Sequence, residues 1–501
     1  MEGVTTRGGP PAGDGGGLAF SSGRGRWVVA ATALGSGIAS LDATVVGIAL
    51  PHIARTFHSG LGTLQWVVTG YALTLSAFLL LGGSLGDRSG RRRLFCIGVV
   101  WFAGSSVLCG VAPSSSTLIS ARILQGIGGA LLTPASLAIL QGSFRPDDRA
   151  RAIGAWSGLS GVATAAGPLV GGYLLAVASW RWVFFINIPV AAAVLAITVR
   201  HVPETRDPTA TGDVDVVGAG FAVVFLAGVT YGLIQGPGDG WTNPVVLGSL
   251  VLGVTAGAAF VWTEMRIPQP MLPLSVFRSR QFTGANAVTF LVYGALGGAL
   301  FLLPIELQIV SGYSALRAGL SLVPVTMLML LFSARSGALA ARIGPRLQMS
   351  LGPLVVGAGL ALLTRTVNDR SFLTGVLPAV VVFGIGLAIT VAPLTSTALS
   401  AAPAEHSGIA SAVNNVVARA AGLFAVAVLP VAAGIAGTGS LRAARFSAGF
   451  HTAVLLAAAL CAGGGLLAAL TIRNREGSAS LRIPRVHQRT YHCAVGMPPP
   501  R

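Results

Sequence analysis

Long apolar runs, each separated from the next by a short polar segment, make up most of the chain. The runs lie at residues 27–50, 64–86, 94–112, 116–140, 151–178, 182–200, 215–235, 244–263, 283–305, 317–340, 347–366, 371–399, 408–436 and 448–472. A helix needs about 20 apolar residues to cross the hydrocarbon core of a bilayer. The runs lack the alternation of apolar and polar residues that is typical of barrel strands. The pattern therefore predicts an all-α integral membrane protein with fourteen transmembrane helices.

The composition agrees with a membrane protein and excludes several other classes. Only 10% of the residues are charged, whereas a soluble domain carries about 25%. The net charge of +17 comes from 33 arginines without any lysine, spread over short segments between the runs. This distribution favours a topology signal over nucleic-acid binding. The four cysteines show no CxxC spacing, so we expect neither a metal site nor a disulfide framework. Without lysine no Walker A motif can exist, and we expect no cofactor.

The arginines also predict an orientation. If the N-terminus lies inside, the inner segments hold 24 arginines and the outer segments seven, while Arg122 and Arg419 fall within runs. Because positive residues accumulate on the cytoplasmic side, both termini are expected in the cytoplasm, with the protein in the cell membrane. Residues 1–26 then form a cytoplasmic N-terminal tail. Residues 473–501 form a cytoplasmic tail whose polar, proline-containing composition predicts disorder.

The loop after the second run recurs after the tenth. Residues 83–92 read GSLGDRSGRR and residues 337–346 read GALAARIGPR, so five positions coincide while Asp87 becomes Ala341. This repeat predicts two six-helix bundles in parallel orientation, a plan known from transporters with a substrate site at the membrane midplane. The predicted parts are an N-terminal bundle, a linker with two extra helices and a C-terminal bundle, at 27–200, 201–281 and 282–472.

Several motifs together resemble one family. The loop at 83–92 matches the pattern G-x-L-a-D-r-x-G-r-r, and the stretch LDATVVGIALP at 41–51 resembles a first-helix signature. Further matches are Arg122 with Gln125, Gly126 and Gly129, Gly161 with GPLVGG at 167–172, and WRWVF with NIP between 180 and 189. Over roughly residues 27–472 the chain resembles the major facilitator superfamily, in particular its fourteen-helix drug:proton antiporter branch.

The resemblance implies a secondary active transporter with the major facilitator fold, and no enzyme. It implies export of small organic molecules of drug or antibiotic type, cationic or amphipathic, in exchange for protons by alternating access, with a monomer as the working unit. Two alternatives remain: a proton-coupled symporter of a small nutrient, and a non-transporting receptor or scaffold. The motif at Gly167 and Pro168 and the extra helix pair argue against the symporter. Asp42 and Arg122 argue against the scaffold, which gains nothing from their insertion cost.

Four ionisable residues are candidates for proton coupling or transport: Asp42, Arg122, Glu306 and Arg419. A carboxylate at bilayer depth costs about 2.5–3.5 kcal/mol on insertion scales, so Asp42 is a candidate to hold a proton or a cationic substrate. The alternative is a structural carboxylate bonded to the backbone or to an arginine. Arg122 either tunes a nearby carboxylate or fixes helix packing through an ion pair, and Arg419 has a comparable setting in the second half. Glu306, where similar transporters often carry an aromatic residue, is a second proton or cation site or an interfacial carboxylate that reaches water.

The repeated loop supplies a second set of candidates: Gly83, Asp87, Arg88, Gly90, Arg91 and Arg92. Asp87 can pair with Arg88 or Arg91, and the glycines permit tight turns and close helix approach. The resemblance implies a latch that steadies one of the two states of the transporter. The alternative is a topology signal alone.

A third set lies on the helix expected at 151–178: Gly161, Gly167, Pro168, Gly171 and Gly172. The spacing of its glycines permits close approach of a neighbouring helix, and its proline permits a bend. The resemblance implies that this bend restricts leak and favours exchange. The alternative is ordinary helix packing.

Overall fold

The computed structural model describes residues 17–206, 215–267, 270–367, 371–401, 407–437 and 441–474, and within them every extended regular element is a helix. The N-terminal helices are α1 Gly23–Phe57, α2 Leu61–Ser89, α3 Arg91–Gly110, α4 Ser115–Ser143, α5 Pro146–Val177, α6 Trp182–Phe185 and α7 Asn187–His201. The next two are α8 Val216–Asp239 and α9 Pro244–Glu264. The C-terminal helices are α10 Arg280–Ile305, α11 Ala315–Ser321, α12 Val323–Ile343, α13 Arg346–Leu362, α14 Leu377–Ser400, α15 Ser407–Ala432 and α16 Ala443–Thr471.

Short irregular helices complete several of these elements. Two are 3₁₀ turns, η1 Leu274–Arg278 and η3 Leu363–Val367, and two are π-helical turns, η2 Glu306–Val310 and η4 Phe372–Val376. When adjoining pieces are joined, the described residues contain fourteen helices that are long and apolar enough to cross a membrane. The predicted fourteen spans are therefore confirmed. Most of the two predicted tails, 1–16 and 475–501, lies outside the described residues.

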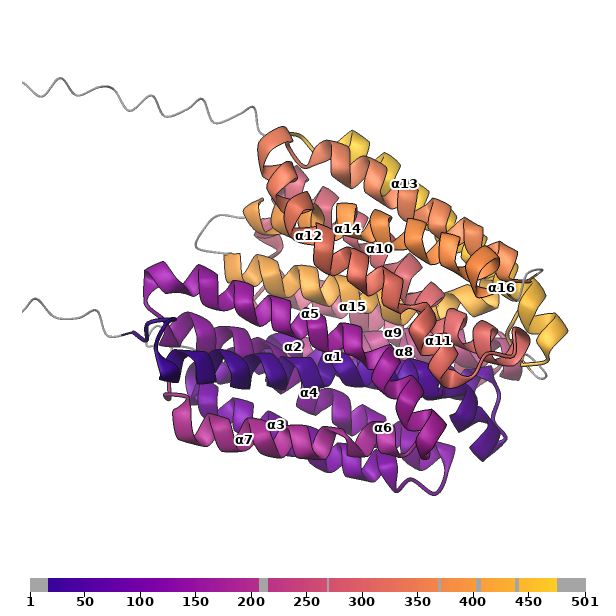
Figure 1. The fold of residues 1–501 in the computed structure, drawn as a ribbon, viewed down its shortest axis with the longest axis horizontal. Helices are drawn as coiled ribbons and strands as arrows, with labels where there is room; N and C mark the ends of the chain where they lie inside the picture. The colour runs from indigo at the N-terminus through magenta and orange to yellow at the C-terminus, as the bar shows by residue number, and fades with distance from the viewer. Residues whose placement is uncertain are drawn as a thin grey trace, which may run out of the picture.

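The helices form two groups with an extra pair between them in sequence (Figure 1). In the N-terminal group α2 and α3 pack on α4, and α1 packs on α5. In the C-terminal group α13 packs on α14 and α16, and α10 packs on α15. The extra pair, α8 with α9, lies against the seam between the groups, since α8 contacts both α2 and α15. With an even number of spans, α1 begins and α16 ends at the same end of the molecule (Figure 1).

The two copies of the repeated loop have the same local geometry. Gly90 and Gly344 each end a helix with a positive φ, of 109° and 87°, a conformation that favours glycine. Each loop is also capped by the segment that follows the last helix of its own half. The Glu204 carboxylate accepts the backbone N–H of Arg92 at 3.0 Å, and the Asn474 side chain accepts that of Arg346 at 3.1 Å. The halves are therefore related in structure as well as in sequence.

One hydrophobic cluster joins the halves at the end opposite these loops. It combines the C-terminal turns of α1 with those of α10 and α15. Two hydrogen bonds also cross there: Gln65 Nε2 donates to the Val426 carbonyl at 2.7 Å, and Gln308 Nε2 donates to the Ile48 carbonyl at 3.0 Å. Toward the repeated loops, two larger clusters of described residues each stay within one half, and a smaller one joins α2 to α8 and α15. The halves are thus closed together at one end and separate at the other.

Candidate functional site

Asp42 and Arg122 form an ion pair inside the N-terminal half. Asp42 lies within α1 and Arg122 within α4, and their exposed fractions are 0% and 1%. Nη1 of Arg122 donates to Oδ2 of Asp42 and also to Oε1 of Gln125, the latter at 2.6 Å. Nε donates to the Val67 carbonyl at 3.1 Å. The structure therefore brings together two of the four predicted coupling residues.

The second oxygen of Asp42 belongs to a wider polar network. Oδ1 accepts from Nε2 of Gln125 and from Nδ2 of Asn187, each at 2.9 Å. Both amides also donate to the Ser106 hydroxyl, at 2.8 Å and 3.3 Å. Sequence reasoning did not assign roles to Ser106, Gln125 or Asn187. The signal was present for two of them, because Gln125 and Asn187 stand in the motifs that carry the family resemblance.

Aromatic rings pack against the guanidinium of this pair. Cζ of Arg122 lies 4.3 Å from the ring centroid of Tyr71 and 5.8 Å from that of Phe184, which are cation–π distances. The pair is electrically neutral as a unit, and neither member is exposed to solvent. In this conformation Asp42 is bound to Arg122 and does not offer its carboxylate to a substrate.

Glu306 is separate from this network and fully buried. It begins the π-helical turn η2, two residues after Pro304, and its exposed fraction is 0%. Neither carboxyl oxygen has a hydrogen-bond partner among the described residues. Burying an unpaired charge costs several kcal/mol, so this position suits a carboxyl group that carries a proton. The side chain does not reach the surface in this conformation.

Arg419 lies in the C-terminal half on α15, and it is half-buried. Its Nε atom is buried without a hydrogen-bond partner among the described residues. Its neighbours include Tyr293 of α10 and Tyr71 of α2, both close enough for electrostatic interaction with the guanidinium. The four predicted coupling residues therefore occupy three places: a paired site, a buried lone carboxyl group and a lone guanidinium.

The predicted latch loop is held by an ion pair within the loop and by hydrogen bonds to residues outside it. Nε and Nη2 of Arg91 donate to Oδ1 of Asp87 at 2.9 Å and 2.7 Å, and Nη1 of Arg91 reaches the Ala138 carbonyl of α4 at 3.2 Å. The Glu204 carboxylate accepts the N–H groups of Arg92 and Arg93 at the start of α3. A carboxylate is favourable there because a helix N-terminus carries a partial positive charge. Sequence reasoning missed Glu204, because it lies far from the loop in sequence.

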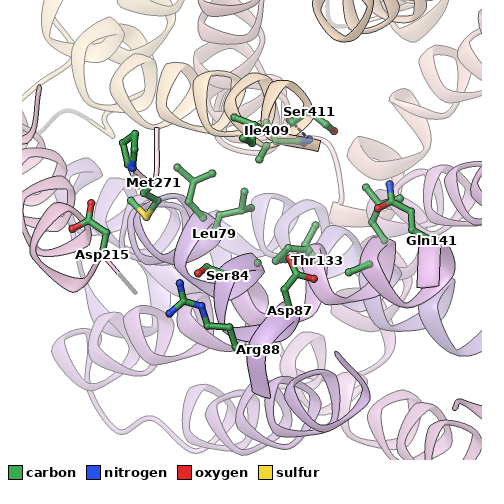
Figure 2. A pocket seen from close by; sticks show the side chains of 18 of the residues that line it. Leu79, Ser84, Asp87, Arg88, Thr133, Gln141, Asp215, Met271, Ile409 and Ser411 are labelled. Atoms are coloured by element: carbon green, nitrogen blue, oxygen red, sulfur yellow. Dashed lines mark hydrogen bonds between the residues drawn. The ribbon is translucent and has the colours of Figure 1, made fainter. Parts of the chain in front are cut away.

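A cavity of about 450 Å³ opens beside this loop, between the two halves. Figure 2 shows Ile409 and Ser411 of α15 on one wall, with Leu79 and Ser84 of α2 on the other. Its remaining lining residues include the latch candidates Gly83, Asp87 and Arg88. The loop is thus part of the rim of the cavity, where the halves are apart.

The glycines of α5 meet two different neighbours. A methyl group added at Gly167 would press on Thr44 of α1, and one at Gly171 would contact Val45. Gly172 lies against the backbone of α11, where a Cβ atom would come within 2.7 Å of Leu316 Cα.

The carbonyl of Pro168 also faces α11, at Gly319. A Cβ atom at Gly161, in contrast, would meet nothing within 4 Å. The C-terminal part of this motif therefore forms the close contact between the halves at the closed end, and Gly161 takes no part in it.

Comparison with known proteins shows to which class of protein the chain belongs. The sequence profile of the Major Facilitator Superfamily matches residues 32–426. The chain is 36% identical to the tetracenomycin C resistance and export protein of Streptomyces glaucescens, over 80% of this chain and 74% of that protein. It is 34% identical to the methylenomycin A resistance protein of Bacillus subtilis strain 168, over 81% of this chain and 86% of that one.

A solved structure agrees in fold. An inward-facing bacterial homologue of the human lysosomal transporter Spinster superposes with a TM-score of 0.62 and 17% identity, over 90% of this chain and 97% of that chain. The protein is accordingly a multi-pass membrane transporter and not an enzyme, and its predicted fold class is confirmed. The chain belongs to the major facilitator superfamily.

Proposed function

We propose that the protein exports small organic molecules of drug or antibiotic type from the cell in exchange for protons. The names of its relatives support the export of such molecules. The observation that carries the proton coupling is Asp42, a carboxyl group buried within a membrane-spanning helix and held by the buried Arg122. Ionisable groups at such depth are costly, and in transporters they mark proton and ion pathways. The exchange needs no cofactor.

The arginine distribution supports an orientation of the protein in the membrane. Under the positive-inside rule the end with the repeated loops faces the cytoplasm of the cell membrane, and both termini lie on that side. The cavity beside the loop then opens inward, and the structure corresponds to the state that takes up substrate. Export requires the contact between α5 and α11 to open, together with the hydrogen bonds of Gln65 and Gln308.

Proton binding at Asp42 would break the ion pair with Arg122. A proton removes the negative charge, so Arg122 keeps its hydrogen bonds to Val67 and Gln125 but loses its counter-charge. An uncompensated buried cation is unfavourable, so a proton taken up from outside must leave Asp42 toward the cytoplasm before the ion pair of the inward-open arrangement can form again. Glu306 supplies a second buried carboxyl group that can carry a proton through the same cycle.

The test is transport by the purified protein in proteoliposomes under an imposed pH gradient. Proton flux is followed with an internal pH dye while a panel of amphipathic compounds, both cationic and anionic, is offered. Asp42→Asn is expected to lower proton-driven transport by about tenfold or more, within the range known for coupled sites. Asp147→Asn, which changes an exposed carboxylate at the start of α5, serves as the matched control.

Two results would contradict the proposal. Normal proton-coupled exchange by Asp42→Asn would remove the coupling role of that residue. Failure of the whole panel to dissipate the gradient through the wild-type protein would contradict the exporter itself. Co-accumulation of a nutrient with protons would favour the symporter instead.

A further inference from the structure

The two arginines inside the membrane-spanning helices differ in one respect. Arg122 is neutralised by Asp42, whereas Arg419 takes part in no salt bridge and no hydrogen bond with a described residue. Of the described carboxyl groups, Asp42 is already paired and Glu306 has no hydrogen-bond or salt-bridge partner at all. The described part of the C-terminal half therefore holds an uncompensated positive charge at the depth of the membrane.

Arg419 continues the face of α15 that lines the cavity. Ala412 and Asn415 both line it, and Arg419 lies one helical turn beyond Asn415 along the same face. Asn415 is exposed, and its side-chain amide donates to the Ser411 carbonyl within the same helix at 3.0 Å. The half-buried guanidinium thus belongs to a residue one helical turn deeper than the lining residue Asn415, although Arg419 itself is not among the residues that line the cavity.

A second donor comes from the neighbouring helix of the same half. Tyr293 of α10 lies close enough to Arg419 for electrostatic interaction, and its hydroxyl has no hydrogen-bond partner among the described residues. The Tyr71 hydroxyl of α2 is not free in the same way, because it donates to the Ala39 carbonyl at 3.2 Å. Arg419 and Tyr293 therefore both hold donors without a partner among the described residues, on two helices that pack on each other.

A guanidinium in this position requires a negative partner. It cannot lose its proton, and it presents a planar set of N–H groups that fits the two oxygens of a carboxylate. A cationic compound would meet repulsion at the same point.

We propose that the inner end of the cavity binds the acidic group of an organic anion, with Arg419 as its charged ligand and Tyr293 as a second donor. This proposal rests on the proposed export function and narrows its substrate class, from the cationic or amphipathic compounds that the family resemblance implies to compounds that carry an acidic group. An organic anion leaving in exchange for an entering proton moves charge in the same sense on both legs of the cycle. Transport is therefore driven by the membrane potential, whereas exchange of a monovalent cation for one proton is not.

The binding test uses three ligands that share one fluorophore: pyrenebutyrate, pyrenebutanol and pyrenebutylammonium. Binding to the purified full-length protein in detergent is measured by fluorescence polarisation. The wild type is expected to prefer the anion to the cation by about tenfold to a hundredfold, as for charge-assisted hydrogen bonds. Arg419→Gln removes this preference and leaves the affinity for the neutral alcohol within about twofold, while Arg419→Lys retains most of it.

Two further variants sharpen the result. Tyr293→Phe is expected to weaken pyrenebutyrate binding less than Arg419→Gln does, since it removes one neutral donor. Arg335→Gln changes an exposed arginine of α12 and is expected to change nothing. Tighter binding of pyrenebutylammonium by the wild type would overturn the proposal. An equal loss of all three ligands in Arg419→Gln, with Arg419→Lys no better, would overturn it as well.

A transport arm separates this proposal from the exporter function. Proteoliposomes are loaded with the same ligands, and the membrane potential is set with potassium and valinomycin at constant pH gradient. Potential-dependent movement of pyrenebutyrate supports the proposal. Proton-driven movement of pyrenebutylammonium alone refutes the anion site and leaves the exporter function intact. Selective binding of the anion without any proton-driven transport supports the site and contradicts the exporter function.

Discussion

Removing one charge of the buried pair should destabilise the protein far more than removing both. In Asp42→Asn, Arg122 keeps its bonds to the Val67 carbonyl and to Gln125 but is left as a buried charge without a counter-charge. In Arg122→Gln, Asp42 keeps the amide donors of Gln125 and Asn187 but is equally unpaired. Breaking a buried pair in this way typically costs about 3–5 kcal/mol. We expect the loss of stability in Arg122→Gln to lie at the lower end of this range, because two amides still donate hydrogen bonds to the carboxylate.

The double variant, with amides at both positions, carries no buried charge at this site. Its loss of stability should therefore be smaller than either single loss. With single losses of about 3 and about 5 kcal/mol and a double loss of about 2 kcal/mol, the coupling energy is about 6 kcal/mol. The assay is reversible unfolding in mixed micelles of a mild detergent and dodecyl sulfate, applied to all four proteins of the cycle. Losses that add within about 0.5 kcal/mol would show that the two side chains do not interact, and the reasoning would fail.

Two further changes test the ends of the molecule. Gly172→Leu should push α5 and α11 apart at the closed end, since a Cβ atom already comes within 2.7 Å of Leu316. The reporter is a cysteine placed at the buried Val45 in a protein that lacks the native cysteines. Its alkylation should become faster with Gly172→Leu and should not change with Gly161→Leu. Equal alkylation rates in the two variants would contradict the assigned contact. Gly90→Ala should lower stability by about 1–3 kcal/mol, because φ of 109° is unfavourable for alanine. Thermal unfolding measures this loss, and an unchanged midpoint would show that the loop relaxes freely.

Sequence patterns were sufficient to predict the spans and the repeat. The length of a span is set by the thickness of the bilayer, and the helix ends of the repeat are set by glycines at positive φ, so both depend only on nearby residues. Each span needs only an apolar run of sufficient length. Gly90 and Gly344 end their helices whatever the relative position of the two halves. Asp42 and Arg122 were also recognisable, since any charge within an apolar run is conspicuous. Their mutual pairing could not be read from the sequence, because it joins residues 80 positions apart.

The same limit explains what was missed. Asn187 and Gln125 are ordinary polar residues until α7 and α4 place them against Asp42, and Asn187 lies 145 positions from that carboxylate. Glu306 lies near the end of its span, where a carboxylate could equally reach water; only the packing around η2 shows that it is buried. The lack of a partner at Arg419 is likewise a property of the assembled helices, and no single motif encodes it.

The extra helix pair covers the seam between the two halves on only one of its lipid-facing sides. On one side α8 bridges the seam, with Tyr231 near Trp66 of α2 and Phe225 against Phe424 of α15. On the other side the seam is formed directly by α5 with α11 and α12. Hydrophobic compounds partition into the leaflet before they meet a protein, so sideways entry from the membrane is hindered where α8 lies. Lateral access would then depend on α5 and α12, and substitutions along those two helices should alter the uptake of lipid-soluble compounds more than that of water-soluble ones.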